Sequence, residues 1–151
     1  MKNTLLLLST IVALSLLLSF SFRYAEALEY EGALSYAGNY CLEHGKYSKA
    51  IYYFNRVLQS YPENSDAQLG KASTLVKLQM YDKAIPYLDK VLKTYPYNFN
   101  AMYYKAVALS ALGKYHEALY YYGQIQKMAP SFPLTEKDLK IIHSEYMVRY
   151  G

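Results

Sequence analysis

The sequence of 151 residues contains no tryptophan and a single cysteine, Cys41. One cysteine cannot form a disulfide within the chain, so no covalent crosslink contributes to its stability. A catalytic thiol would also need a neighbouring base, and no part of the sequence identifies one. We therefore expect Cys41 to be a small core residue and the fold to be stabilised by packing alone.

A strong excess of charge is also missing. The 16 basic and 12 acidic residues give a formal net charge of +4. The lysines are spread singly along the chain, whereas nucleic-acid-binding proteins usually gather them on one face or along one helix. We therefore expect no nucleic-acid partner.

The sequence contains no motif of an active site. The three histidines His44, His116 and His143 form no HExxH pair, and no two of them are four residues apart. No phosphate-binding loop and no GxSxG nucleophile elbow is present. We expect a protein that is not an enzyme, with no metal site and no cofactor.

The N-terminal segment resembles a targeting sequence. Residues 4–22 carry no charge, are rich in leucine and follow the basic Lys2, a pattern typical of a signal peptide or a signal anchor. Ala25 and Ala27 provide the small residues that signal peptidase requires, which favours cleavage after Ala27, while the length of the apolar run favours a retained anchor. Both alternatives place residues 28–151 outside the cytoplasm, either exported or membrane-anchored.

The remaining sequence repeats with a period of 34 residues, and the segments align without insertion or deletion. Such a period is typical of helical repeat proteins. Four columns of equivalent residues define the register: Tyr47, Tyr81 and Tyr115; Ala50, Ala84 and Ala118; Val57, Val91 and Ile125; Pro62, Pro96 and Pro130. A fifth column contains the small residues Gly38, Ala72 and Ala106.

Each repeat predicts two antiparallel helices. In the third repeat, a first helix over 99–111 ends at a tight turn around Gly113, because glycine readily adopts the left-handed conformation that ends helices. The small residues are expected where the two helices cross, and the regularly spaced prolines end each second helix. Pro86 is expected in or beside the first turn of its helix, with Asp82 as the helix cap.

These residues resemble the tetratricopeptide (TPR) family in the pattern of tyrosine, alanine, large apolar residue and proline. The resemblance covers residues 31–132, with repeats at 31–64, 65–98 and 99–132. It implies an all-α solenoid of three helix-turn-helix hairpins, preceded by an N-terminal hydrophobic helix within 1–27. The first helices depart from the family at two columns, where a large aromatic residue and a leucine are usual: Leu34, Gln68 and Met102; Ala37, Lys71 and Lys105.

The last segment, 133–151, predicts a capping helix. Thr135 with Asp138 three residues later is a variant of the capping box that begins helices. Apolar residues then recur at a helical spacing, at Leu139, Ile142, Tyr146 and Tyr150. We expect this helix to cover the last repeat, because the terminal units of a solenoid need a polar outer face.

The resemblance also implies a concave groove, lined by the first helices, that binds a peptide or helix of another protein. By register, this peptide-binding groove would contain Ser35, Asn39, Leu42, Leu69, Ser73, Val76, Tyr103, Val107 and Ser110. The alternative is that these residues only help neighbouring repeats to stack. Family members that bind carboxyl tails use basic residues and asparagines, but the matching positions here are Ser35, Asn39, Gly70, Asn100 and Tyr104. A receptor for acidic carboxyl tails is therefore disfavoured.

The twenty tyrosines suggest a second function. By register, Tyr52 and Tyr120 lie on the outer side of the second helices, and exposed tyrosine is common at protein and membrane interfaces. A structural, self-associating protein at the membrane surface, forming a homo-oligomer without a dedicated peptide ligand, is the alternative to a binding module.

Overall fold

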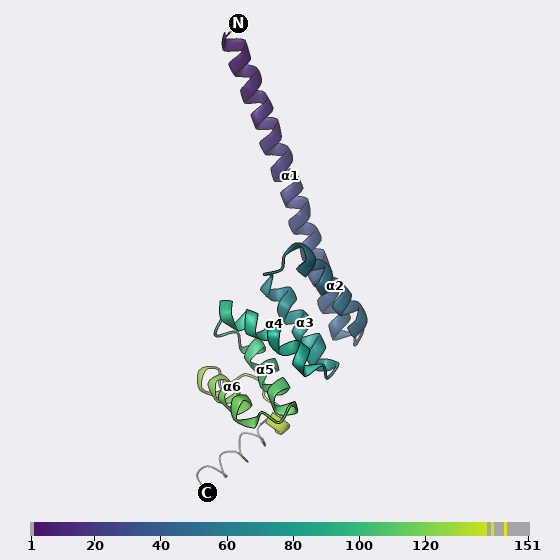
Figure 1. The fold of residues 1–151 in the computed structure, drawn as a ribbon, viewed down its shortest axis with the longest axis vertical. Coiled ribbons are helices and arrows are strands. Elements are labelled where there is room, and N and C mark those ends of the chain that lie inside the picture. Colours follow the sequence, from purple (N-terminus) through teal and green to yellow (C-terminus); the bar gives the residue numbers. More distant parts are fainter. Residues whose placement is uncertain (1, 139, 141–143, 145–151) are drawn as a thin grey trace.

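The computed structural model describes the backbone of residues 2–138, 140 and 144, and the side chains of these residues outside 2–11 and 24–28. Within these residues the chain forms six long helices: α1 (Lys2–Glu43), α2 (Tyr47–Ser60), α3 (Ser65–Lys77), α4 (Tyr81–Thr94), α5 (Phe99–Ala111) and α6 (Tyr115–Met128). Consecutive helices pack against each other, and α1 and α5 also contact α3. The predicted all-α solenoid of three helical hairpins is confirmed, with the end of α1 as the first helix of the first hairpin (Figure 1).

Helix α1 is much longer than the first helix of a repeat. It runs without interruption from Lys2 to Glu43, and its N-terminal part projects away from the other helices (Figure 1). Among the residues whose side chains are described, no helix is both long enough and apolar enough to cross a membrane. The predicted N-terminal hydrophobic helix and its cleavage after Ala27 stay predictions.

The turns between paired helices follow the repeat. Gly45 and Gly113 have φ angles of +68° and +75°, in the left-handed region that ends helices. Gln79 occupies the same place in the second repeat with φ of 59°, and it is the one non-glycine residue with positive φ in the described part of the chain. The turn geometry therefore persists in a repeat that lacks the glycine.

The helix starts differ from the prediction at Pro86. Helix α4 begins at Tyr81, its N-cap is Met80, and the cap position makes no side-chain hydrogen bond. Asp82 is therefore inside the helix and does not cap it, and Pro86 is the sixth helical residue, beyond the first turn. The proline ring leaves the carbonyl of Asp82 without its helical N–H donor.

Asparagine side chains begin two other helices. Asn64 accepts a hydrogen bond from the N–H of Ala67 at 2.8 Å, and Asn98 accepts one from Ala101 at 2.9 Å. Both asparagines come directly before the first helix of a repeat, at the same register position. Asparagine is among the preferred N-cap residues, so the sequence contained a signal for these two starts.

The core consists of the repeat columns. Ala50, Ala84 and Ala118 are fully buried, as are Ala72 and Ala106, and Gly38 of the fifth column is also buried. The largest residues between them are Phe54, Leu88 and Tyr122, which are 34 residues apart and have no exposed surface. Small residues on one helix thus face a large residue on the next, which allows close packing of the helices.

A capping box begins the segment after α6. The N–H of Asp138 donates to Thr135 Oγ1 at 3.2 Å, and the N–H of Thr135 donates to Asp138 Oδ2 at 2.8 Å. This reciprocal pair is the predicted capping motif. The apolar residues predicted for the rest of this helix, Leu139, Ile142, Tyr146 and Tyr150, lie outside the described residues.

Candidate peptide-binding groove

The nine predicted groove residues differ widely in exposure. Asn39 is exposed, and five others are half-buried: Ser35, Leu42, Leu69, Tyr103 and Val107. The remaining three, Ser73, Val76 and Ser110, are buried. The surface that a ligand could contact is therefore smaller than the sequence predicts.

The apolar groove residues also pack against neighbouring helices. Leu42 contacts the buried cluster around Phe54, and Leu69 and Val107 contact the cluster around Leu88. Ser73 donates a hydrogen bond to the carbonyl of Gly70 at 3.0 Å, within its own helix. These contacts stabilise the array whether or not a ligand occupies the groove.

Tyr103 lies at the centre of an aromatic cluster. Its ring centroid is 5.6 Å from Tyr104, 6.4 Å from Tyr122 and 5.7 Å from Phe132. Burial, together with the nearby negative charge of Asp138, raises the pKa of Tyr103 to about 12. Its hydroxyl therefore stays protonated, and able to donate a hydrogen bond, across the physiological pH range.

A polar cleft of about 360 Å³ contains two of the predicted groove residues, Val107 and Ser110. It lies between α4, α5, α6 and the capping segment, and its other lining residues are Tyr81, Ala111, Tyr115, Tyr122, Lys137 and Asp138. Hydroxyl groups, one carboxylate and one ammonium thus meet beside apolar side chains. Such a mixture of apolar walls and a few polar groups is typical of ligand sites.

Asp138 anchors the capping segment at this cleft. Its side chain is 4% exposed and accepts hydrogen bonds from Tyr122 Oη at 2.5 Å and from Thr135 Oγ1 at 2.6 Å. Burial, and then the hydrogen bond to this carboxylate, raises the pKa of Tyr122 far above its usual range. The repeat period could not predict this contact, because Asp138 lies outside the repeats.

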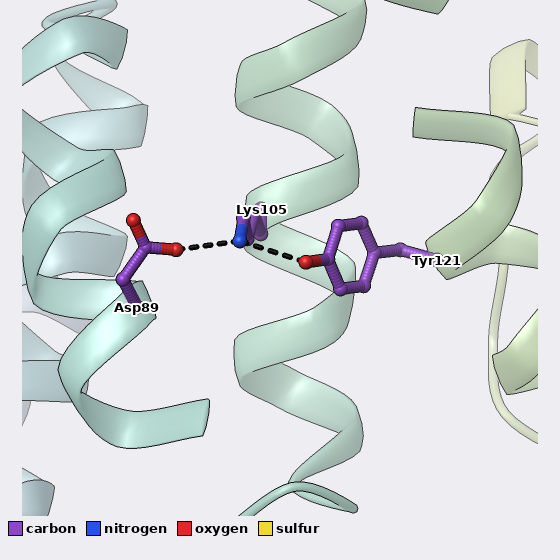
Figure 2. Close-up of polar contacts among 3 residues, drawn as sticks. All are labelled: Asp89, Lys105 and Tyr121. Carbon is purple, nitrogen blue, oxygen red and sulfur yellow. Dashed lines mark hydrogen bonds and ion pairs between the residues drawn. The ribbon is translucent and has the colours of Figure 1, made fainter. Parts of the chain in front are cut away.

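A second set of polar contacts involves the lysines that depart from the family pattern. Lys105 Nζ lies 2.5 Å from Asp89 Oδ1 and 2.7 Å from Tyr121 Oη, so it joins α4, α5 and α6 (Figure 2). Burial alone would lower the pKa of Lys105, but the hydrogen bonds to Asp89 and Tyr121 outweigh it and hold the pKa above its usual value. Lys71 makes the same 2.7 Å hydrogen bond to Tyr87.

The positions that bind carboxyl tails in other family members carry no basic side chain here. Gly70 is buried against Phe54, and Tyr104 is half-buried, which raises its pKa. In the described part of the chain, no group of three or more His, Cys, Asp or Glu side chains could hold a metal ion. The buried cysteine Cys41 packs with Ala50, Phe54 and Val57.

The comparisons with known families identify the repeats. A family model described as anaphase-promoting complex, cyclosome, subunit 3 matches residues 43–125, and a model described as tetratricopeptide repeat matches residues 21–64. No curated protein sequence matches the chain.

Solved structures with the same fold include several TPR domains. The first TPR domain of human RPAP3 is 20% identical with a TM-score of 0.66, covering 79% of this chain and 93% of that domain. The first TPR of Spaghetti (RPAP3) bound to HSP90 peptide SRMEEVD is 19% identical with a TM-score of 0.69, covering 82% of this chain and 95% of the other.

A third similar structure, the MamA RS-1 ArsTM double mutant, is 20% identical with a TM-score of 0.68 over 79% of this chain. The chain spans 65% of the length of that protein. One family model covers more than half of the chain, and the second names the repeat itself. Because the hairpins also have the fold of solved TPR domains, the chain belongs to the tetratricopeptide repeat family.

Proposed function

We propose that this chain is a non-catalytic protein-interaction module that binds a peptide or helix of another protein in its concave groove. The observation that carries the proposal is the cleft of about 360 Å³ beside Val107 and Ser110. A related domain, the first TPR of Spaghetti, has been solved bound to an HSP90 peptide. The half-buried Ser35, Leu69 and Val107 and the exposed Asn39 provide surface on three successive first helices.

The chemistry of this surface favours a ligand with aliphatic side chains. Its members are apolar side chains, hydroxyls and one amide, with no basic residue among the nine predicted positions. A peptide with aliphatic side chains would bury them against Leu69 and Val107, and its backbone would form hydrogen bonds with Ser35 and Asn39. None of these nine positions offers an acidic carboxyl tail a charge-assisted partner.

We further propose that the module acts outside the cytoplasm or at the membrane surface. The proposal rests on the uncharged run 4–22 and on Ala25 and Ala27 behind it. If the segment is cleaved, the mature chain begins at Leu28. Intact-mass measurement of the protein from its native host decides this: recovery of the full-length chain in the detergent-soluble membrane fraction alone would refute cleavage and support the anchor.

A structural, self-associating protein is the second candidate, and the exposed tyrosines favour it. Tyr36, Tyr52, Tyr97 and Tyr120 are each between 58% and 74% exposed. Large exposed aromatic side chains are enriched at protein interfaces. Formation of discrete oligomers by the purified chain, without any captured partner, would support this function over peptide binding.

The direct test is a crosslinking pull-down with groove variants of the full chain. Asn39→Glu and Ser35→Glu place a charge in a groove suited to aliphatic side chains, so we expect them to reduce partner recovery by roughly tenfold. Gln126→Glu, at an exposed residue of α6, is the matched control and should behave as the parent. Equal recovery with all three variants would exclude α1 from the binding site and leave only the cleft beside Val107 and Ser110.

A further inference from the structure

The ion pair of Lys105 shows how this array neutralises a half-buried lysine. The ammonium group lies between Asp89 of the preceding helix α4 and Tyr121 of α6, at 2.5 Å and 2.7 Å (Figure 2). Its Nζ atom is also 4.7 Å from the centroid of the Tyr121 ring. Only 15% of the Lys105 side chain is exposed, so the carboxylate replaces much of the water that the ammonium has lost.

Lys71 occupies the same place one repeat earlier, but without the carboxylate. It donates to Tyr87 Oη at 2.7 Å, and its Nζ atom is 4.4 Å from the Tyr87 ring centroid. The residue equivalent to Asp89, 34 positions earlier, is Asn55, which is neutral. Among the described residues, no carboxylate lies within ion-pair distance of Lys71.

A basic groove of about 460 Å³ opens beside Lys71. Its lining consists of Lys71, Leu75, Lys83, Pro86, Tyr87 and Lys90, so three ammonium groups surround an apolar floor without any acid. The acidic residues nearest in sequence do not compensate them: Asp82 is exposed and outside the lining, and Asp89 is paired with Lys105. We call this surface the Lys71 groove.

The Lys71 groove is separate from the predicted peptide-binding groove. On a helix, successive residues are rotated by about 100°, so residues two positions apart point in nearly opposite directions. Lys71 is two positions from both Leu69 and Ser73, the groove residues of α3. The two surfaces therefore lie on opposite faces of this helix.

We propose that the Lys71 groove binds an acidic side chain of a partner protein, whose carboxylate takes the place at Lys71 that Asp89 has at Lys105. An ammonium group has three N–H donors, and Tyr87 accepts one of them, which leaves two for a carboxylate. Lys83 and Lys90 attract the negative charge, and Leu75, Pro86 and Tyr87 contact an adjacent apolar side chain. The ligand is therefore a segment in which acidic and aliphatic residues alternate.

The test uses the full-length chain in a nonionic detergent and a capped tetrapeptide, acetyl-Glu-Leu-Glu-Leu-amide. Binding is followed by the shifts of ¹⁵N-labelled backbone resonances of Lys71, Leu75 and Tyr87. We expect saturable shifts with this peptide, and at least tenfold weaker binding of the uncharged acetyl-Gln-Leu-Gln-Leu-amide. Binding should weaken as salt is added, because the attraction is electrostatic.

Two variants test the proposed role of the Lys71 ammonium group. Lys71→Gln removes the ammonium group, whereas Asn55→Asp supplies an internal carboxylate that occupies it, and each should weaken peptide binding at least tenfold. Lys77→Gln, at an exposed lysine of the same helix outside the groove, should bind as the parent. Asn39→Glu should also bind as the parent, so failure of the concave-groove function is distinguished from failure of this one.

Three results would overturn the proposal. Unchanged affinity in Asn55→Asp would show that the carboxylate does not occupy the place of Asp89. Equal affinity for the Glu and Gln peptides would show that the negative charge is not recognised. Saturation of the same resonances by inorganic phosphate at lower concentration than by the peptide would assign the site to a phosphate and not to an acidic side chain.

Discussion

Replacement of Gly70 by alanine tests how tightly the first two repeats are packed. Gly70 lies on α3, opposite the ring of the fully buried Phe54 on α2. A Cβ atom at residue 70 would lie 2.9 Å from Phe54 Cε2 and closer still to Cζ and Cε1. Carbon atoms in contact are normally about 3.5 to 4.0 Å apart, so the ring must move.

The ring has little room to move. Gly38 of α1 encloses the same end of Phe54, and a Cβ atom there would lie 2.7 Å from Cε1. Overpacking of this kind destabilises proteins by about 1 to 3 kcal/mol. Alanine is the better helix former and offsets about 1 kcal/mol, which leaves a net destabilisation of up to about 2 kcal/mol. For an array of this size, each kcal/mol of destabilisation should lower the thermal midpoint by about 4 to 8 °C.

Gly123→Ala is the matched control. Gly123 is an exposed residue of α6, and a Cβ atom added there would meet nothing within 4 Å. The same substitution should therefore raise the thermal midpoint, through a gain of about 0.5 to 1 kcal/mol in helix propensity. The two glycine variants should change the thermal midpoint in opposite directions, which separates the effect of packing from that of helix propensity.

The assay is thermal unfolding followed by circular dichroism. A second variant, Phe54→Leu, shortens the residue that clashes, and leucine already occupies the equivalent position at Leu88. Combining it with Gly70→Ala should recover part of the loss, which gives a favourable coupling energy between the two sites. A Gly70→Ala variant that melts at or above the parent temperature would refute the packing described for this interface.

Three further predictions concern the turns, the helix crossings and the aromatic cluster. Gln79→Gly should raise the thermal midpoint by a few degrees, because the residue has a φ of 59° and glycine removes up to about 1 kcal/mol of backbone strain; an unchanged or lower midpoint would contradict this. Ala84→Leu inserts three carbon atoms at a fully buried helix crossing, so it should destabilise the fold by about 1 to 3 kcal/mol and lower the midpoint. A melt like that of the parent would show that the crossing is looser than described. Stability against urea should be constant up to about pH 10 and fall between about pH 10 and 12. The reason is that the pKa of Tyr103 is about 12 in the folded protein and near 10 in the unfolded chain, so the unfolded chain loses its proton first. Tyr103→Phe should make that fall shallower, and an equally steep fall would assign it to other tyrosines.

The periodicity predicted the fold well because each repeat column has one physical role. Alanine at 50, 84 and 118 is small at every helix crossing, and the structure buries all three completely. The glycine at 113 predicted one turn, and the structure shows the same left-handed turn at Gly45 and Gln79, which share its register position. Local chemistry misled the prediction at Asp82, because an acidic residue near a helix start suggests a cap, whereas the N-cap of α4 is Met80, two residues earlier.

The sequence predicted which positions form the groove, but not which of them are exposed. Register places Ser73 and Ser110 on the same face as Asn39, but the structure buries the two serines and leaves Asn39 exposed. The exposure of a side chain depends on how closely its helix packs against the neighbouring helices. The repeat pattern of the sequence does not contain this information. For the same reason, the sequence could name Asp138 as part of a helix cap but could not predict its hydrogen bond with Tyr122.

The sequence by itself thus determined the class of fold, the number of hairpins and the places of their turns, because these depend on contacts within a period of 34 residues. Only the tertiary structure decided which lysines are neutralised. Lys71 and Lys105 are equivalent in sequence, and both departed from the family pattern in the same way. Lys105 has a carboxylate partner because α4 carries Asp89 where it packs against α5, whereas α2 carries Asn55 at the equivalent place beside α3. A residue of the preceding repeat decides whether the charge of each lysine is balanced. This pairing exists only once the helices are packed side by side.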